Sequence, residues 1–312
     1  MRDRLWDRLR HSWHEIWFAP GESTNLAAAR IIVAAHAIWV LVSWDIASLS
    51  GLPDGFWWNV RQTTQWRFFI FPGHPGVERL AEGVALLALL AVLVGVWTRG
   101  SALIAAALLY HLGPLQAFLV HNDPHNRGFT IAVLSLVVLS ASRCADAWCV
   151  RVRRGPASPS EAPPPQWEYT WPLRLMQLFV AQVYLFGFWG KLSESGLAWF
   201  TPEQLGRHAV IFEHRLPGRS LTHLGSVVAD STLLTTLGAV AVFVFELGFI
   251  ATLWSRAARR IMVPAAVGFH IGILLTMQIF YVGVFHLLLF VNWSWLAGVL
   301  RERRSGALPA GT

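Results

Sequence analysis

The stretch LLTTLGAVAVFVFELGFIATLW, residues 233–254, holds a single ionisable side chain, Glu246. A helix rises 1.5 Å per residue, so this run would be about 33 Å long, close to the thickness of a bilayer's hydrocarbon core. A soluble core helix does not require so long an uninterrupted apolar run. The stretch therefore predicts a transmembrane helix.

Seven further apolar runs are bounded by charged residues or helix breakers and predict spans of the same kind. Together with the first, they lie near 24–44, 79–97, 101–119, 128–142, 172–192, 233–254, 260–278 and 283–300. The expected fold class is all-α, a polytopic transmembrane helical bundle of about eight spans. Long outer loops are expected after spans 1 and 5, with short interfacial helices within 66–76 and 197–218.

The composition agrees with a membrane bundle. The 312 residues are 54% hydrophobic and 14% charged, with a mean hydropathy of +0.46, whereas about a quarter of the residues of a soluble domain are charged. These values exclude a soluble two-domain enzyme. The net charge of +7 is attributed to arginines in cytoplasmic loops, so no nucleic-acid partner is expected.

The placement of arginine predicts the orientation. If the N-terminus is cytoplasmic and the spans alternate, the inner segments hold fifteen arginines and the outer segments hold seven, which satisfies the positive-inside rule. We therefore expect both termini in the cytoplasm and the bundle in a bacterial inner membrane. The expected parts are an amphipathic segment at 1–19, the bundle at 20–300 with a Pro-rich linker at 154–166, and a tail at 301–312.

Ionisable side chains inside spans are costly and usually face the bundle interior. Arg30 in the first span and Glu246 in the sixth both lie toward the expected cytoplasmic half, so the sequence predicts a structural ion pair between them. The alternative for Arg30 is to extend to the headgroups. His270 lies in the middle of the seventh span, and His286 begins the eighth.

Two sets of residues resemble metal ligands only in part. His121 and His125 have the spacing of a helical metal pair, but Pro124 between them argues against a regular helix. Cys144 and Cys149 are spaced C-x4-C, which is neither the C-x-x-C of a redox site nor a full zinc set. No metal site is expected.

Lys191 is the only lysine of the chain and ends the fifth span, between Trp189 and Trp199. Gln177, Tyr184 and Lys191 are seven residues apart, so they share one face of a helix. A desolvated lysine loses its proton readily and can act as a general base. The alternative is a lysine that extends to the outer headgroups.

Histidines are expected near the same end of the bundle. His121, His125 and His286 lie where spans 3–4 and 7–8 turn at the outer face, and His270 would lie below them. The sequence therefore predicts that a lysine, a tyrosine and several histidines line one pocket in the outer half.

Four stretches together resemble one known family. They are NLAAARIIVAAHAIWVLVSWD (25–45), HNRGFTIAVLSLVVLSASRCADAW (125–148), QVYLFGFWGKLSESGLAWFTPEQL (182–205) and GFHIGILLTMQIF (268–280). They are similar to the horizontally transferred transmembrane (HTTM) domain family, the membrane part shared with vitamin K-dependent gamma-glutamyl carboxylase. The resemblance covers roughly residues 20–300, and its most specific motif runs from Tyr184 to Trp199. The chain departs from the family pattern at Ala34, where glycine is usual, and at 125–128.

The resemblance implies roles for particular residues. In the carboxylase the lysine that matches Lys191 deprotonates vitamin K hydroquinone, and His125 and His270 match histidines near that reaction centre. The catalytic candidates are therefore Lys191, His125, His270 and Tyr184. The candidates for binding a quinone-like cofactor or ligand are Gln177, Trp189, Trp199 and His286.

The carboxylase also carries a large lumenal domain, for which this chain shows no counterpart, so glutamate carboxylation is not expected. Two hypotheses remain open. The first is a membrane enzyme, or a remnant of one, that acts on a quinone-like or lipid-like substrate with Lys191 as base. The second is a non-catalytic membrane accessory protein for the maturation or export of a secreted peptide. Besides the lipid bilayer, the partner is then a quinone or lipid ligand, or a secreted peptide or protein.

Overall fold

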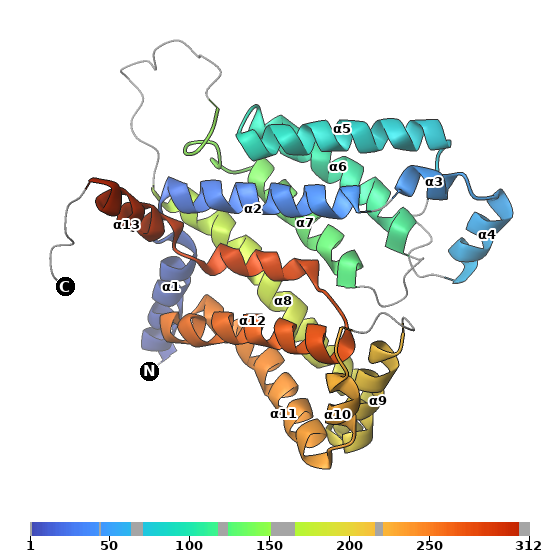
Figure 1. Cartoon of the computed structure of the whole chain (residues 1–312). Coiled ribbons are helices and arrows are strands. Elements are labelled where there is room, and N and C mark those ends of the chain that lie inside the picture. The colour runs from blue at the N-terminus through green and yellow to red at the C-terminus, as the bar shows by residue number, and fades with distance from the viewer. Residues whose placement is uncertain are drawn as a thin grey trace, which may run out of the picture. The chain divides into compact units, whose positions relative to one another are not determined.

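The computed structural model describes residues 2–43, 45–63, 71–117, 124–150, 166–215 and 221–305 (Figure 1). These described residues form helices joined by turns and loops, and no strand occurs among them. The expected all-α class is therefore confirmed. The chain divides into two compact units, Met1–Met176 with Leu288–Thr312, and Gln177–Leu287.

The helices of the first unit come from both ends of the chain. They are α1 (Arg2–Phe18), α2 (Ser23–Val42), α3 (Ile46–Ser50), α4 (Asp54–Thr63), α5 (Pro75–Val94), α6 (Thr98–Ala117), α7 (Pro124–Ser140), the 3-10 helix η2 (Gln166–Tyr169) and α13 (Trp293–Ser305). Within this unit α2 packs against α5, α7 and α13, and α6 packs against α5 and α7. Helix α2 is thus enclosed by neighbours.

Small residues allow α2 to be enclosed. Ala27, Ala29, Ala34 and Ala37 are each at most 1% exposed. Small side chains let helix backbones approach closely in membrane bundles, where packing rather than water drives association. The alanine-rich sequence of α2 therefore explains its central place in this unit.

The second unit is built around the end of α8 (Thr170–Ser195), a helix that begins in the first unit. It continues with η3 (Gly196–Phe200), α9 (Pro202–Glu213), α10 (Leu224–Ala229), α11 (Thr232–Gly248), η4 (Phe249–Leu253), α12 (Arg256–Met277) and the start of η5 (Val282–Phe290). Helix α9 packs against α10, α11 and α12, and α11 packs against η3. Trp199, Leu205 and Ala239 form a buried apolar cluster here.

Four helical segments of the described residues are long and apolar enough to cross a membrane: Ser23–Val42, Gln166–Phe200, Thr232–Leu253 and Arg256–Met277. A bent pair, Val282–Phe290 with Trp293–Arg303, would add a fifth, and Phe129–Ser140 is a shorter apolar helix. Each expected span thus contains helix. The number eight is not established, since α5, for example, carries Glu78, Arg79 and Glu82 near its start.

Several expected segments lie partly or wholly outside the described residues. The linker at 154–166 overlaps the undescribed 151–165, and the stretch 66–76 is described only from 71 onward. The expected amphipathic segment at 1–19 contains α1, on which Trp6 and Trp13 are 62% and 58% exposed. The stretch 197–218 contains the expected helix, α9.

Candidate functional site

The lone lysine contacts a buried carboxylate. Lys191 Nζ on α8 lies 2.7 Å from Oε1 and 2.8 Å from Oε2 of Glu246 on α11. It also donates to the carbonyl oxygen of Gly187 at 3.3 Å. The side chains are 21% and 7% exposed, respectively. The two apolar helices are therefore joined by an ion pair that is largely withdrawn from solvent.

Two neighbours define the space around this pair. The indole of Trp199 lies beside the ammonium, with the ring centroid 5.2 Å from Lys191 Nζ, a distance at which the ring face attracts a cation. The same indole donates to the carbonyl oxygen of Ala239 at 3.4 Å. Gly187 leaves room for the carboxylate, because a β-carbon there would stand 2.9 Å from Glu246 Oε1.

A second polar contact lies on the same helix. Tyr184 Oη and His270 Nε2 are 2.9 Å apart, which joins α8 to α12. His270 stacks on Tyr281 with ring centroids 5.1 Å apart, and its Nδ1 is buried without a hydrogen-bond partner among the described residues. Phe249 packs on Tyr184 at 4.2 Å between centroids. This histidine thus has one ring nitrogen engaged and one available inside an aromatic enclosure.

The contact between Lys191 and Glu246 corrects their expected depths. The sequence placed Lys191 at the outer end of its span and Glu246 toward the cytoplasmic half, and two atoms 2.7 Å apart cannot lie at opposite ends. The physical reason is that α8 continues to Ser195 and η3 continues to Phe200. Lys191 therefore lies within a helical segment and not at its end.

Arg30 and Glu246, which the sequence paired, each have another partner. Arg30 is 0% exposed and donates to the carbonyl oxygens of Cys144 at 2.8 Å, Ala147 at 3.4 Å and Trp148. These carbonyls belong to the turn that follows α7. A guanidinium can satisfy several acceptors at once because its donors form a rigid fork, so Arg30 holds this turn against α2.

The structure places the remaining site candidates individually. Gln177 and His286 are buried, at 3% and 0% exposure, whereas Trp189 is 60% exposed. Trp189 and Lys191 are two residues apart on α8, which puts them on different sides of the helix. The side chain of His125 lies outside the described residues, although its backbone belongs to α7. Lys191 and Trp199 are thus brought together, and so are Tyr184 and His270.

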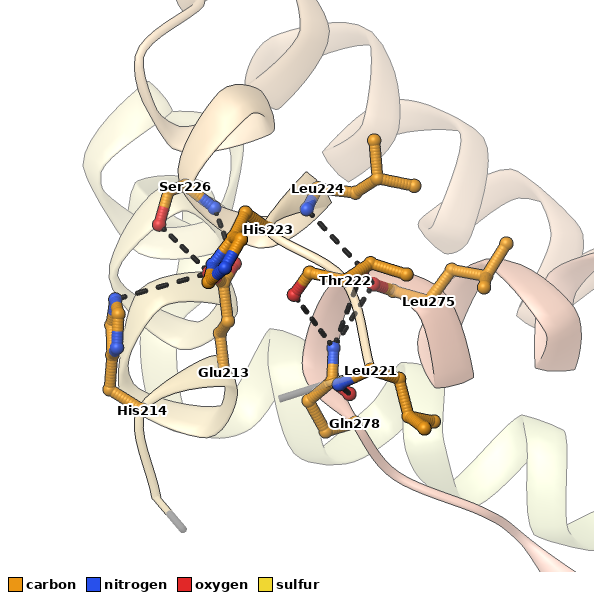
Figure 2. A network of polar contacts seen from close by, with 9 residues as sticks. All are labelled: Glu213, His214, Leu221, Thr222, His223, Leu224, Ser226, Leu275 and Gln278. Atoms are coloured by element: carbon orange, nitrogen blue, oxygen red, sulfur yellow. Dashed lines mark hydrogen bonds and ion pairs between the residues drawn. The ribbon is translucent and has the colours of Figure 1, made fainter. Parts of the chain in front are cut away.

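Sequence reasoning also missed the buried carboxylate of Glu213, which Figure 2 shows from close by. Glu213, at the end of α9, has a side chain that is 0% exposed. It accepts hydrogen bonds from Ser226 N at 2.7 Å and Ser226 Oγ at 3.1 Å, and His223 Nδ1 lies 3.1 Å from its Oε1. Ser226 and His223 both contact the carboxylate of Glu213, whereas in a catalytic triad the histidine would lie between the serine and the carboxylate. The carboxylate therefore anchors α10 and does not activate Ser226 as a nucleophile.

The environment of Glu213 changes its acidity. Burial raises the pKa of the carboxyl, but the hydrogen bonds from Ser226 and His223 lower it by more, so the net pKa lies below the ordinary value. Gly225 permits the close approach, since a β-carbon there would stand 2.4 Å from Glu213 Oε2.

Gln278, the left-handed C-cap of α12, extends this network. Its Oε1 accepts from Leu221 N at 2.7 Å, and its Nε2 donates to the carbonyl oxygen of Leu275 at 3.3 Å and to that of Thr222 at 3.4 Å (Figure 2). The turn before α10 is thereby tied to α12 as well as to α9. Glu213 and His223 are ten positions apart in the sequence, a spacing that matches no local motif, so the sequence offered no signal for this cluster.

No protein-family model, curated protein or solved structure matches the chain.

Proposed function

We propose that the chain is a multi-spanning membrane protein of the HTTM or vitamin K-dependent carboxylase-like superfamily that binds a quinone-like or lipid-like ligand, with Lys191 as general base. The proposal includes eight spans, cytoplasmic termini and a bacterial inner membrane. The contact between Lys191 and Glu246 is the observation that carries it. It places the single lysine in an apolar setting, beside a group with which it can exchange a proton.

The pair suits a base in a medium of low dielectric. An isolated buried charge is costly, but an ammonium beside a carboxylate and an amine beside a carboxylic acid are both neutral overall. A proton can therefore pass between Lys191 and Glu246 without leaving a net charge in the bilayer. In the second form the amine of Lys191 can take a proton from a ligand hydroxyl, and the ammonium then formed stabilises the ligand's oxyanion.

The contact between Tyr184 and His270 supports the same proposal. Tyr184 and Lys191 are seven residues apart on α8, so they lie on one face and about 10 Å apart along the axis. His270 Nδ1, buried and without a partner among the described residues, offers a hydrogen bond within an aromatic enclosure. A ring ligand with oxygen substituents needs both apolar walls and such isolated polar groups.

One observation favours the alternative, a non-catalytic accessory protein for a secreted peptide. Lys191 already has both oxygens of Glu246 and one backbone carbonyl as acceptors. A purely structural ion pair would occupy the N–H donors of the ammonium in the same way.

Native mass spectrometry and lipid extraction of the chain purified in mild detergent test the proposal. We expect a co-purifying quinone. A bound peptide without quinone would support the accessory function instead.

The role of Lys191 as the base is tested with a reduced naphthoquinone. Dioxygen oxidises this quinol faster when the quinol is deprotonated to its anion. We expect wild type to accelerate this oxidation and Lys191→Arg, with its fold kept, not to. Equal rates would remove Lys191 as the base.

A further inference from the structure

A polar pocket of about 380 Å³ lies in the first unit and shares no lining residue with the lysine site. Such a volume is within the range of small-ligand sites. The polar side chains and the indole that line it are Glu22, Thr24, Asn292, Ser294, Trp295 and Arg301. The pocket is therefore formed by the start of α2 and by one side of α13, which pack against each other.

The pocket lies at the end of a candidate membrane span. Ser23–Val42 is apolar and long enough to cross a bilayer, and Glu22 is the residue that immediately precedes it. Arg301 follows the apolar part of α13. Trp295 is 66% exposed, and tryptophan side chains favour the boundary between headgroups and acyl chains. With Ser23–Val42 as a membrane span, these positions correspond to headgroup depth.

Side-chain hydrogen bonds hold two of the lining residues, Asn292 and Ser294, in place. Asn25 and Ser294 bond to each other twice: Asn25 Nδ2 donates to Ser294 Oγ at 3.2 Å, and Ser294 N donates to Asn25 Oδ1 at 3.0 Å. Ser294 Oγ in turn donates to Asn292 Oδ1 at 2.7 Å, which also accepts from Trp295 N at 3.2 Å. These bonds fix the positions of the two side chains next to Trp295.

Two side chains of opposite charge line this pocket and do not pair with each other. Glu22 is the N-cap residue of α2, yet its carboxylate makes no capping hydrogen bond. Within the described part of the chain, neither Glu22 nor Arg301 forms an ion pair. A ligand with a cationic and an anionic group could therefore meet both.

We propose that this pocket binds the headgroup of a zwitterionic aminophospholipid, with the ammonium at Glu22 and the phosphate at Arg301. A guanidinium pairs with phosphate oxygens in a bidentate manner, and a primary ammonium donates N–H bonds to a carboxylate. The acyl chains of such a lipid extend from the headgroup into the bilayer, an interaction that a soluble phosphate ester does not make. A trimethylammonium headgroup has no N–H to donate and fits less well.

Native mass spectrometry of the full chain, with equimolar phosphatidylethanolamine, phosphatidylcholine and phosphatidylglycerol of identical acyl chains, tests the proposal. Wild type is expected to retain phosphatidylethanolamine at least tenfold over the other two. Glu22→Gln removes this preference over phosphatidylcholine, and Arg301→Gln lowers the retention of all three lipids. Arg303→Gln, on the same helix but outside the pocket lining, leaves the preference unchanged.

Gly298→Leu provides a variant that does not alter a charge. Gly298 lines the pocket, and a β-carbon there would meet no atom within 4 Å, so the leucine enters the pocket and should abolish the preference while thermal unfolding stays unchanged. Equal retention of the three lipids by wild type, or a preference that survives Glu22→Gln, would overturn the proposal. Displacement of the lipid by phosphoethanolamine at the same concentration would overturn the lipid assignment in favour of a soluble phosphate ester.

Discussion

Gly187 and Glu246 approach so closely that a β-carbon at residue 187 would stand 2.9 Å from Glu246 Oε1 and 3.2 Å from its Cδ. Real β-carbons essentially never approach an atom closer than 3.0 Å. The glycine on α8 thus makes the space that the carboxylate on α11 occupies when it meets Lys191. The ion pair therefore depends on the glycine at residue 187 as much as on the two charges.

Gly187→Ala is expected to displace the Glu246 carboxylate, at an overpacking cost of about 1–3 kcal/mol. Alanine's gain of about 0.5–1 kcal/mol in a helix offsets part of this cost, so the free energy of unfolding should fall by at most about 2.5 kcal/mol. Gly190→Ala is the matched control on the same helix, because a β-carbon there would meet no atom within 4 Å. Alanine is the better helix former, so this control should gain about 0.5–1 kcal/mol. Thermal unfolding in detergent measures both variants. A stabilised Gly187→Ala variant would show that the carboxylate lies elsewhere.

Removing one partner of the ion pair should cost more than removing both. Lys191→Met or Glu246→Leu leaves a charge without its partner, which costs about 3–5 kcal/mol in a buried pair; the lower end applies because Lys191 is 21% exposed. The double variant Lys191→Met with Glu246→Leu should unfold close to wild type. A double-mutant cycle from reversible unfolding in detergent gives the coupling energy, and strictly additive losses would contradict a direct pair.

The fold class could be predicted from the sequence because the hydrophobicity of its long apolar runs determines it. A run such as 233–254 cannot be left in water, so its length and hydropathy alone determine a helix. The number of spans did not follow in the same way. The eighth expected run, at 283–300, bends between η5 and α13, where Asn292 accepts two hydrogen bonds that a continuous apolar span would not have required.

The sequence could predict only those parts of the site that lie on one helix, α8. Helical periodicity placed Tyr184 and Lys191 on one face of α8 without knowledge of any other helix. Glu246 was recognised as needing a partner, but hydropathy does not tell which of two buried cations meets it, because that choice depends on how α8 and α11 cross. The Glu213 cluster depends in the same way on contacts between helices that are apart in sequence.

Arg30→Met should destabilise the turn after α7. The guanidinium donates to three backbone carbonyls there, and hydrogen bonds to charged groups are worth about 1.5–3 kcal/mol each, so we expect a loss of about 3 kcal/mol or more. Arg30→Lys should recover only part, because an ammonium lacks the planar fork. Arg99→Met, an exposed arginine of the same unit, is the control. Trypsin cleavage after Arg143 should become faster in Arg30→Met, and an unchanged rate would show that the turn is held by other contacts.

Glu213 should make stability depend on pH. Hydrogen bonds from Ser226 and His223 outweigh burial and keep the pKa of this carboxyl below its ordinary value in the folded chain, whereas the unfolded chain has the ordinary value of about 4.3. Between the two values the unfolded state binds more protons, so stability rises with pH there. The contribution is fully present above the unfolded pKa and is lost as pH falls through the lower folded pKa. Thermal unfolding in detergent should show Glu213→Gln well below wild type at pH 6, with a gap that stays constant down to about pH 5 and narrows as the pH falls below the unfolded pKa of about 4.3. Glu194→Gln, at an exposed position of α8, should follow wild type throughout. A gap between Glu213→Gln and wild type that does not narrow below that pKa would mean that the carboxylate's charge contributes nothing to holding α10 against α9.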